Sequence, residues 1–451
     1  MSLRFRGFGS SLVVSALIVS GLMALRLVSL IGSVWAMIPL TPPTAQLLEW
    51  QDMSFFVLPS EPDPAAENIM HKYLKSLSNK GAVESKQGIW IHSGLKKIAT
   101  HQSTVPLPAA SLTKIATTLA VLDRWEPTHQ FETLVGTTGT IKDGVLQGDL
   151  VITGSGDPFF IWQEAIALGN SLEELGVRRV NGNLLIVGDF YFNYQQDSAA
   201  AGQLLRQGIN ARLWSAATVA RRHRSLPPGT PKPQVEIVGQ VKVAKTSPAQ
   251  TSLLLRHRSL SLAEILRQMN IYSDNDLSQL LADSVGGAQV TAQLAAKYAG
   301  VPQAEIQLIN GSGLGVANRI SPRAAVAMLM AIERLLQPHQ LSLTDLFPVA
   351  GREKGGTMLE RQIPIGSAIK TGTLRQVSAL AGVIPTRDRG LVWFAIINGG
   401  GSFWEFRAQQ DKLLGELSQQ WGTLESDQIK ITATPVLLGD PLRNEGIRTE
   451  G

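Results

Sequence analysis

Three strand-like segments followed directly by a helical pattern end the clearly patterned part of this 451-residue chain. The strands are expected at residues 367–374 (SAIKTGTL), 378–386 (SALAGVIPT) and 390–399 (GLVWFAIING), and the helix covers residues 405–421. Each strand is a short run rich in β-branched or other apolar residues, and turn residues separate the runs. This order predicts an antiparallel meander closed by a helix.

Helical patterns precede the meander, and a segment of different character interrupts the chain before them. Helices are expected at 261–269, 276–285, 290–299 and 321–336, at 64–77, and from Ser111 onward, where apolar residues recur at three- and four-residue spacing. Two short strands are expected within 88–100. Between the helical pattern that starts at Ser111 and the one at 261–269, strand-like runs at 131–141, 145–154 and 183–190 indicate a β-rich insertion. The pieces on either side of the insertion therefore have to pack together, which predicts an α+β fold.

This pattern divides the chain into four parts. We expect an α+β domain made of two pieces, residues 45–130 and 250–425, with the β-rich inserted domain at 131–249. The tail, 426–451, has no clear pattern and is expected to be mobile. We see no repeat of fixed period.

The first 40 residues indicate export. Arg4 and Arg6 precede an apolar run, and a second apolar run continues from Arg26 to Leu40. A cationic start followed by an apolar stretch is typical of a secretory signal, and residues 34–36 (VWA) offer a cleavage site. An uncleaved membrane anchor is the alternative. Either interpretation places the rest of the chain outside the cytoplasm, in the periplasm or cell envelope.

Composition excludes several kinds of chemistry. The chain has no cysteine, which rules out disulfides, thiolate metal sites and a cysteine nucleophile. The net charge of +5 is spread along the chain, so we expect no nucleic-acid partner. Neither a Gly-x-x-x-x-Gly-Lys loop nor a His-Glu-x-x-His pair occurs, so we infer no nucleotide, metal or other cofactor.

Ser93 and Ser111 each begin a Ser-x-x-Lys pattern, and their local structure separates the two. Ser93 lies in an expected turn beside Gly94, so nothing fixes Lys96 against it. Ser111 begins an expected helix, where residues three apart share a face, so Lys114 can touch it. A helix start also offers free N–H groups beside the serine. Ser111 is therefore either a nucleophile with Lys114 as its base or an ordinary helix cap.

Two further short motifs follow in order along the chain. Ser273-Asp274-Asn275 lies between two helical patterns, where a capping turn is the plain alternative. In the third motif, Lys370-Thr371-Gly372-Thr373, Lys370 interrupts an apolar strand, and an exposed edge-strand lysine is the plain alternative. Gly372 permits close approach of another backbone or a ligand. The ordered trio resembles the constellation of the active-site serine penicillin-binding proteins and β-lactamases.

Acyl transfer explains why these residue types are needed. Serine is a weak nucleophile until a base takes its proton, and lysine is a weak base until its pKa falls toward neutrality. Burial and a second cation both lower a lysine pKa, so we expect Lys370 to act on Lys114 in this way. The backbone N–H groups of Ser111 and Thr373 would form an oxyanion hole.

The remaining motif side chains suit substrate binding. Ser273 can relay a proton to the leaving amine, and Asn275 can hold an amide of the acyl group. Thr371 and Thr373 can hydrogen-bond a terminal carboxylate, with Lys370 supplying positive charge.

The chain resembles the D-alanyl-D-alanine carboxypeptidase/endopeptidases of the class C low-molecular-mass penicillin-binding proteins, the S13 peptidase family. Besides the trio, the likeness rests on residues 148–160, 176–192, 309–315, 347–361 and 369–399. By motif position it implies that Ser111 is the nucleophile and Lys114 the general base. It places Ser273 and Asn275 in the second motif, and Lys370, Thr371 and Gly372 in the third.

The resemblance also implies a fold and partners. The fold would be a β-lactamase/transpeptidase-like domain with an insertion between the first and second motifs. The substrates would be peptidoglycan stem peptides ending in D-Ala-D-Ala, with cross-links as further substrates, and β-lactam antibiotics would acylate the serine.

The chain departs from the family pattern at three places. The interval from Ser111 to Ser273, 162 residues (273 − 111), is shorter than usual, and the Trp-x-x-Asp segment of the insertion is not found. Val316 stands where the family has an arginine. These departures leave the catalytic assignment unaffected. They weaken what the resemblance implies about specificity for the substrate's side chains and about endopeptidase activity. A β-lactamase-like hydrolase and a non-catalytic cell-wall scaffold are the alternative functions.

Overall fold

The computed structural model describes residues 62–94, 96–215, 219–353, 355–424 and 436–447. The predicted export segment, 1–40, lies outside these residues. Among the helices that the model does describe, none is long and apolar enough to cross a membrane.

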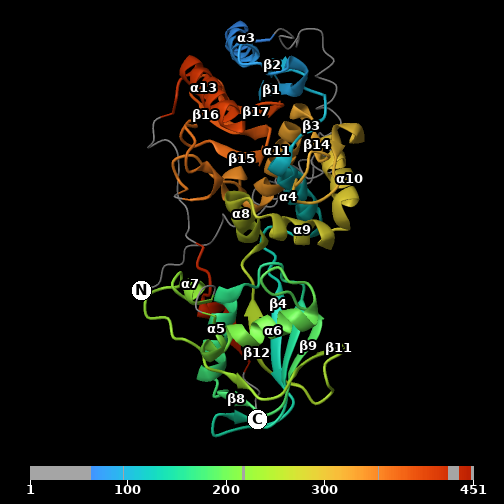
Figure 1. Ribbon diagram of the computed structural model, residues 1–451, viewed down its shortest axis with the longest axis vertical. Coiled ribbons are helices and arrows are strands. Elements are labelled where there is room, and N and C mark those ends of the chain that lie inside the picture. The colour runs from blue at the N-terminus through green and yellow to red at the C-terminus, as the bar shows by residue number, and fades with distance from the viewer. Residues whose placement is uncertain (1–61, 95, 216–218, 354, 425–435, 448–451) are drawn as a thin grey trace, which may run out of the picture. The chain divides into compact units, whose positions relative to one another are not determined.

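A five-stranded antiparallel sheet joins the two flanking pieces of the chain (Figure 1). Its strands, in spatial order, are β15 (Ala368–Leu374), β16 (Val377–Thr386), β17 (Gly390–Gly399), β1 (Gln87–Ser93) and β2 (Lys96–His101). Strand β1 pairs with β17 along its whole length, from Gln87 opposite Asn398 to Ser93 opposite Val392. The predicted meander is therefore present, and the piece before the insertion completes its sheet.

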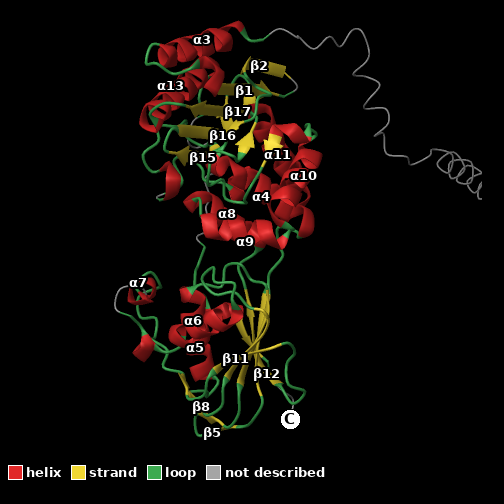
Figure 2. Ribbon diagram, turned by 45° about the vertical axis from the view of Figure 1, so that its right-hand side comes forward, coloured by secondary structure: helices red, strands yellow, loops and turns green. Residues whose placement is uncertain are grey.

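Helices cover both faces of this sheet (Figure 2). Helices α3 (Pro64–Ser78) and α13 (Phe403–Trp421) pack on the face that carries Leu380, Phe394 and Ile396. The opposite face, with Ala379, Ala381 and Ala395, packs in one core with a larger group of helices. That group contains α4 (Thr113–Arg124), α8 (Leu262–Tyr272), α9 (Asn275–Ser284), α10 (Gly287–Ala299), α11 (Pro322–Leu336) and α12 (Leu343–Leu346). Because successive strand residues face opposite sides, each strand contributes to both cores.

The insertion has its own hydrophobic core around a mixed sheet. The strands of this sheet, in spatial order, are β11 (Val241–Ala244), β9 (Leu184–Asp189), β7 (Leu150–Ser155), β4 (Glu132–Thr137), β12 (Ser252–Arg258) and β18 (Asn444–Gly446). A smaller sheet contains β10 (Glu236–Ile237), β8 (Arg179–Val180), β6 (Val145–Leu146) and β5 (Ile141–Lys142). A third sheet, in the α+β domain, contains β13 (Ile306–Gln307), β14 (Arg319–Ile320) and β3 (Leu107–Pro108).

Helices α5 (Trp162–Glu174), α6 (Ser198–Gly208) and α7 (Val219–His223) also belong to the insertion, so the expected β-rich character was incomplete. In α5, ten of the 13 residues are buried. A helix buried nearly all round lacks the single apolar stripe that reveals a helix in a sequence.

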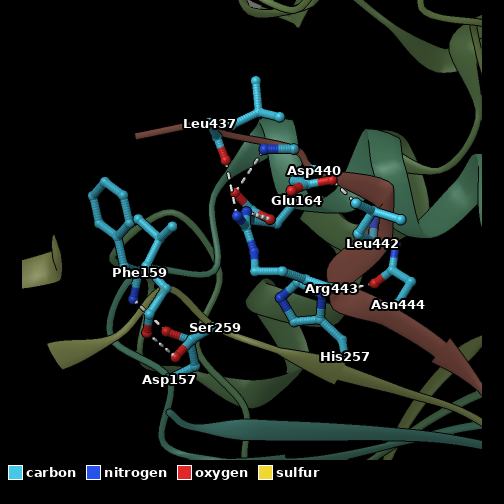
Figure 3. Close-up of polar contacts among 12 residues, drawn as sticks. Asp157, Phe159, Glu164, His257, Ser259, Leu437, Asp440, Leu442, Arg443 and Asn444 are labelled. Atoms are coloured by element: carbon cyan, nitrogen blue, oxygen red, sulfur yellow. Dashed lines mark hydrogen bonds and ion pairs between the residues drawn. The ribbon is translucent and has the colours of Figure 1, made fainter. Parts of the chain in front are cut away.

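Within the expected tail, residues 436–447 are described, and they are part of the fold. Strand β18 pairs with β12, and β12 in turn pairs with β4, although β12 follows the expected end of the insertion at residue 249. Figure 3 shows the side chain of Arg443 reaching Glu164 and the carbonyl of Leu437. The insertion's sheet thus draws strands from both sides of the predicted boundary at 249–250 and from the tail.

Candidate active site

Ser111 lies in a single 3₁₀ turn, η3 (Ala110–Leu112), directly before helix α4. The residue before it, Ala110, has a φ of 48°, a left-handed conformation that a residue with a Cβ adopts at a cost. The positions that cap the turn and the helix are Ala109 and Leu112, and neither cap uses a side chain. Ser111 is therefore not a helix cap, and its hydroxyl is left for another use.

Lys114 lies about one helical turn after Ser111 and is fully buried. Its Nζ is 3.3 Å from Ser111 Oγ, 2.7 Å from Asn275 Oδ1 and 2.8 Å from the carbonyl oxygen of Ser312. Burial lowers the pKa of Lys114 to about 7, against the opposing effect of the nearby Asp274 carboxylate. A lysine with this pKa is neutral in a large fraction of molecules at pH 7 and can accept a proton.

The second motif connects helices α8 and α9. Ser273 ends α8 in a left-handed conformation, with a φ of 53°, and Asp274 caps α9 by accepting from the N–H of Leu277. The expected capping turn is thus present, and Asp274 performs it. This arrangement leaves the side chains of Ser273 and Asn275 free to reach the two lysines.

The third motif lies on β15, at the edge of the five-stranded sheet. Lys370 is nevertheless fully buried, so it is not the exposed edge lysine of the plain alternative. Its Nζ donates to Ser273 Oγ at 3.0 Å and to the carbonyl oxygen of Thr371 at 2.9 Å. The three motifs therefore meet in a single network.

Burial and the proximity of the two lysines both favour neutral amines at this site. Burial is the main cause of the low pKa of Lys114. Burial also lowers the pKa of Lys370 well below its usual value, and the charge of Lys114 lowers it further. Repulsion between two amines is reciprocal, so a proton on either lysine disfavours a proton on the other.

Because Gly372 has no side chain, β15 can pack closely against η3, the turn that contains Ser111 (the nucleophile turn). A Cβ at this position would lie 2.8 Å from the carbonyl oxygen of Ala109 and 3.0 Å from the backbone nitrogen of Ser111. Such distances leave no room for a side chain without movement of the backbone. The expected close approach of another backbone is therefore confirmed, and this backbone belongs to the nucleophile turn.

A cavity of about 250 Å³ opens over these groups. Its lining includes the predicted Ser111, Ser273, Asn275, Thr371 and Thr373. Ser93 does not line it: the Ser93 hydroxyl donates to the carbonyl oxygen of Arg389 instead.

Five lining residues were not among the predicted site residues: Gly313, Leu314, Thr357, Leu374 and Arg407. Two of them hydrogen-bond to the third motif. Thr357, from the 3₁₀ turn η7 (Gly356–Met358), accepts a hydrogen bond from Thr371 Oγ1 at 2.7 Å. Arg407 of α13 donates to Thr373 Oγ1 at 2.8 Å. Thr357 lies within a stretch that resembles the family, whereas Arg407 belongs to an ordinary amphipathic helix pattern and gave no signal.

The described residues contain no group of three or more acidic, histidine or cysteine side chains placed to hold a metal ion.

Comparison with known proteins adds the family. The model of the D-Ala-D-Ala carboxypeptidase 3 (S13) family matches residues 71–201 and 230–419 of the chain. The chain belongs to this family. It is accordingly a serine-type D-Ala-D-Ala carboxypeptidase, as the three motifs and the family resemblance predicted.

Two curated relatives align over most of their length. A carboxypeptidase of Mycobacterium tuberculosis is 27% identical over 337 residues, covering 65% of this chain and 71% of the relative. The D-alanyl-D-alanine carboxypeptidase DacB of Haemophilus influenzae is 22% identical over 408 residues, covering 67% and 82%.

Solved structures share the fold at low identity. The Bd3459 predatory endopeptidase of Bdellovibrio bacteriovorus, in complex with immunity protein Bd3460, has a TM-score of 0.66 and 18% identity, covering 80% of this chain and 99% of that one. Penicillin-binding protein 4 of H. influenzae has a TM-score of 0.55 and 19% identity, covering 77% and 98%. The predicted transpeptidase-like fold with an insertion is therefore confirmed.

Proposed function

We propose that this S13 enzyme removes the terminal D-alanine from peptidoglycan stem peptides through an acyl-enzyme on Ser111. The observation that carries the proposal is the placement of a buried amine, Lys114 Nζ, 3.3 Å from Ser111 Oγ. Because burial brings the pKa of this amine to about 7, Lys114 can act as general base near neutral pH.

The steps follow from the contacts. Neutral Lys114 accepts the Ser111 proton as Oγ attacks the carbonyl carbon of the penultimate D-alanine. The backbone N–H groups of Ser111 and Thr373, on the two segments that Gly372 brings together, stabilise the oxyanion. Collapse of the tetrahedral intermediate breaks the peptide bond. The leaving amine takes a proton from the Ser273 hydroxyl, which Lys370 contacts. The proton that Lys114 accepted from Ser111 replaces it on Ser273, so Lys114 is neutral again. Water then hydrolyses the ester, with Lys114 again as base.

Asn275 has a positioning part in this scheme. Its Oδ1 accepts from Lys114 at 2.7 Å, which leaves its amide nitrogen for an acyl-side carbonyl of the substrate.

The proposal also covers the location of the enzyme outside the cytoplasm and the cleavage of peptidoglycan cross-links as a second activity. Peptidoglycan lies outside the cytoplasm, so the substrate agrees with the expected export segment at residues 1–40 and with a cell-envelope location. Cleavage of cross-links also stays a prediction. In its favour, the cavity shares Thr357 and Arg407 with a groove of about 890 Å³ along α13, which has room for a larger leaving group.

A single labelling experiment tests the proposal. Benzylpenicillin should acylate the enzyme, because its strained amide offers the same carbonyl chemistry as the substrate. Intact mass should rise by the mass of one penicillin, and peptide mapping should place the adduct on the peptide that contains Ser111. A folded protein without an adduct, in a tube where the penicillin stays intact, would contradict the proposal. Consumption of the penicillin without an adduct would instead indicate a fast β-lactamase.

The rate of acylation should depend on pH through Lys114. The base must be neutral, and its pKa is lowered to about 7, so the second-order rate constant should rise about tenfold per pH unit below 7 and level off above it. Stopped-flow acylation between pH 5 and 10 measures this profile. A rate that keeps rising to pH 10 would show a lysine with an ordinary pKa.

A variant sharpens the pH test. The Asp274 carboxylate raises the pKa of Lys114 against the effect of burial. Asp274→Asn should therefore move the midpoint of the profile to lower pH, whereas a midpoint that moves upward or stays unchanged would mean that another group is titrating.

A further inference from the structure

Arg407 occupies a distinctive place at the active site. It extends from the first turns of α13, lines the cavity over Ser111, and donates from Nη2 to Thr373 Oγ1 at 2.8 Å. Among the described residues that line this cavity, Arg407 has the one charged side chain.

The guanidinium is held in place without an ion pair among the described residues, because the carboxylates of Asp411 and Glu360 act on it only from beyond ion-pair distance. Its Cζ lies 5.3 Å from the ring centre of Phe403 and 5.4 Å from that of Trp404, within the range of cation–π contact. Its Nε is buried without a hydrogen-bond partner, and no ion pair involves Arg407 in the part of the chain that the structure describes. Nearby Arg361 shows the contrast, because it pairs with Asp411 at 2.7 Å. Arg407 is thus a fixed cation whose anion is not supplied by these residues.

Lys370 is poorly placed to provide the charge that the sequence assigned to it. Its Nζ is fully buried, is already used by Ser273 and the carbonyl of Thr371, and is not part of the cavity lining. Burial also lowers its pKa well below the usual value, which favours the neutral amine. Arginine, by contrast, remains charged throughout the pH range of proteins.

We propose that Arg407, together with the Thr373 hydroxyl, binds the carboxylate of the substrate's leaving residue. This inference rests on the proposed function, since it assigns the recognition of the free C-terminus that defines a carboxypeptidase substrate. A guanidinium presents several N–H donors in one plane, which suits a carboxylate. The Thr373 hydroxyl, held by one of those donors, can turn its own proton to the same anion.

Two thioesters with one acyl group test the assignment. Both carry an N-acyl-D-alanyl group; one releases thioglycolate, which has a carboxylate, and the other releases thioglycolamide, which is neutral. The scissile bond is the same, so the ratio of their kcat/KM values isolates the carboxylate. We expect Arg407→Gln to lower kcat/KM for the carboxylate thioester about 10- to 100-fold, as expected for loss of a charged hydrogen bond. The neutral thioester should change less than threefold, which also shows that the variant is folded.

Controls separate this role from the alternatives. Arg375→Gln removes an exposed arginine directly after β15, the strand that contains Thr373. Arg375 does not line the cavity, so this variant should leave the ratio of the two kcat/KM values unchanged. Arg407→Lys keeps the charge and should recover part of the preference. Equal loss on both thioesters, or no loss on either, would overturn the inference. If the wild-type enzyme cleaves neither thioester and no D-Ala-D-Ala peptide, the proposed function itself fails.

Discussion

Ser111→Ala is expected to remain folded and to form no covalent adduct with benzylpenicillin. Without the hydroxyl no acyl-enzyme can form, so release of D-alanine should fall by about 10⁴-fold or more, to the level that binding and the oxyanion hole alone provide. The free energy of unfolding should be nearly unchanged, because the hydroxyl caps neither η3 nor α4. The contact it loses is a long hydrogen bond, 3.3 Å from Lys114 Nζ. Intact mass reports the adduct, and circular dichroism reports the fold.

Ser93→Ala is the matched control for this result. Ser93 begins another Ser-x-x-Lys pattern, but its hydroxyl donates to the carbonyl oxygen of Arg389 outside the cavity. The control should acylate at the wild-type rate. An adduct that persists in Ser111→Ala, mapped to Ser273 or another residue, would contradict the assignment of the nucleophile.

The local parts of this site follow from the sequence. Ser111 and Lys114 are three residues apart at the start of a helical pattern, and this spacing alone brings their side chains onto one face. The strand with Lys370 and the small residue Gly372 is likewise visible as a short apolar run. These features depend on neighbours in the chain, so a sequence contains them directly.

The long-range parts do not follow from local pattern. That Asn275 meets Lys114 and that Ser273 meets Lys370 depends on how helices and sheet pack, and only resemblance to a family suggested it. The same limit applies to the pKa values of the two lysines: each depends mainly on burial, and burial is a property of the packed structure. Arg407 was missed because a single arginine on an amphipathic helix looks like a solvent-exposed residue.

The C-terminal residues show a different limit. A segment without periodic apolar residues was expected to be mobile, yet it adds strand β18 to the sheet and buries Arg443. Its attachment uses individual polar contacts: Glu164 accepts from the N–H of Gly439 and from Arg443, and His257 and Asn444 are hydrogen-bonded at 2.7 Å (Figure 3). Contacts of this kind leave no periodic trace in a sequence.

Arg443→Met should therefore destabilise the insertion severely. Only 4% of the Glu164 side chain and 12% of the Arg443 side chain are exposed, so the variant leaves a buried carboxylate without its cation, a change that typically costs about 3–5 kcal/mol. Denaturant unfolding followed by tryptophan fluorescence measures the loss, and Trp162 on α5 lies two residues from Glu164.

A double variant and an exposed pair decide whether the buried charge is the cause. Glu164→Gln combined with Arg443→Met removes both charges and should recover most of the lost stability, because no unpaired ion remains. Arg179→Met breaks the ion pair with Glu236 in the same insertion, where both side chains are about 45% exposed, and should cost about 1 kcal/mol or less. If Arg443→Met unfolds no more easily than Arg179→Met, the C-terminal segment does not stabilise the insertion and the ion pair has no structural importance. If the double variant is as unstable as Arg443→Met, packing of the arginine stem rather than neutralisation of Glu164 holds the segment in place.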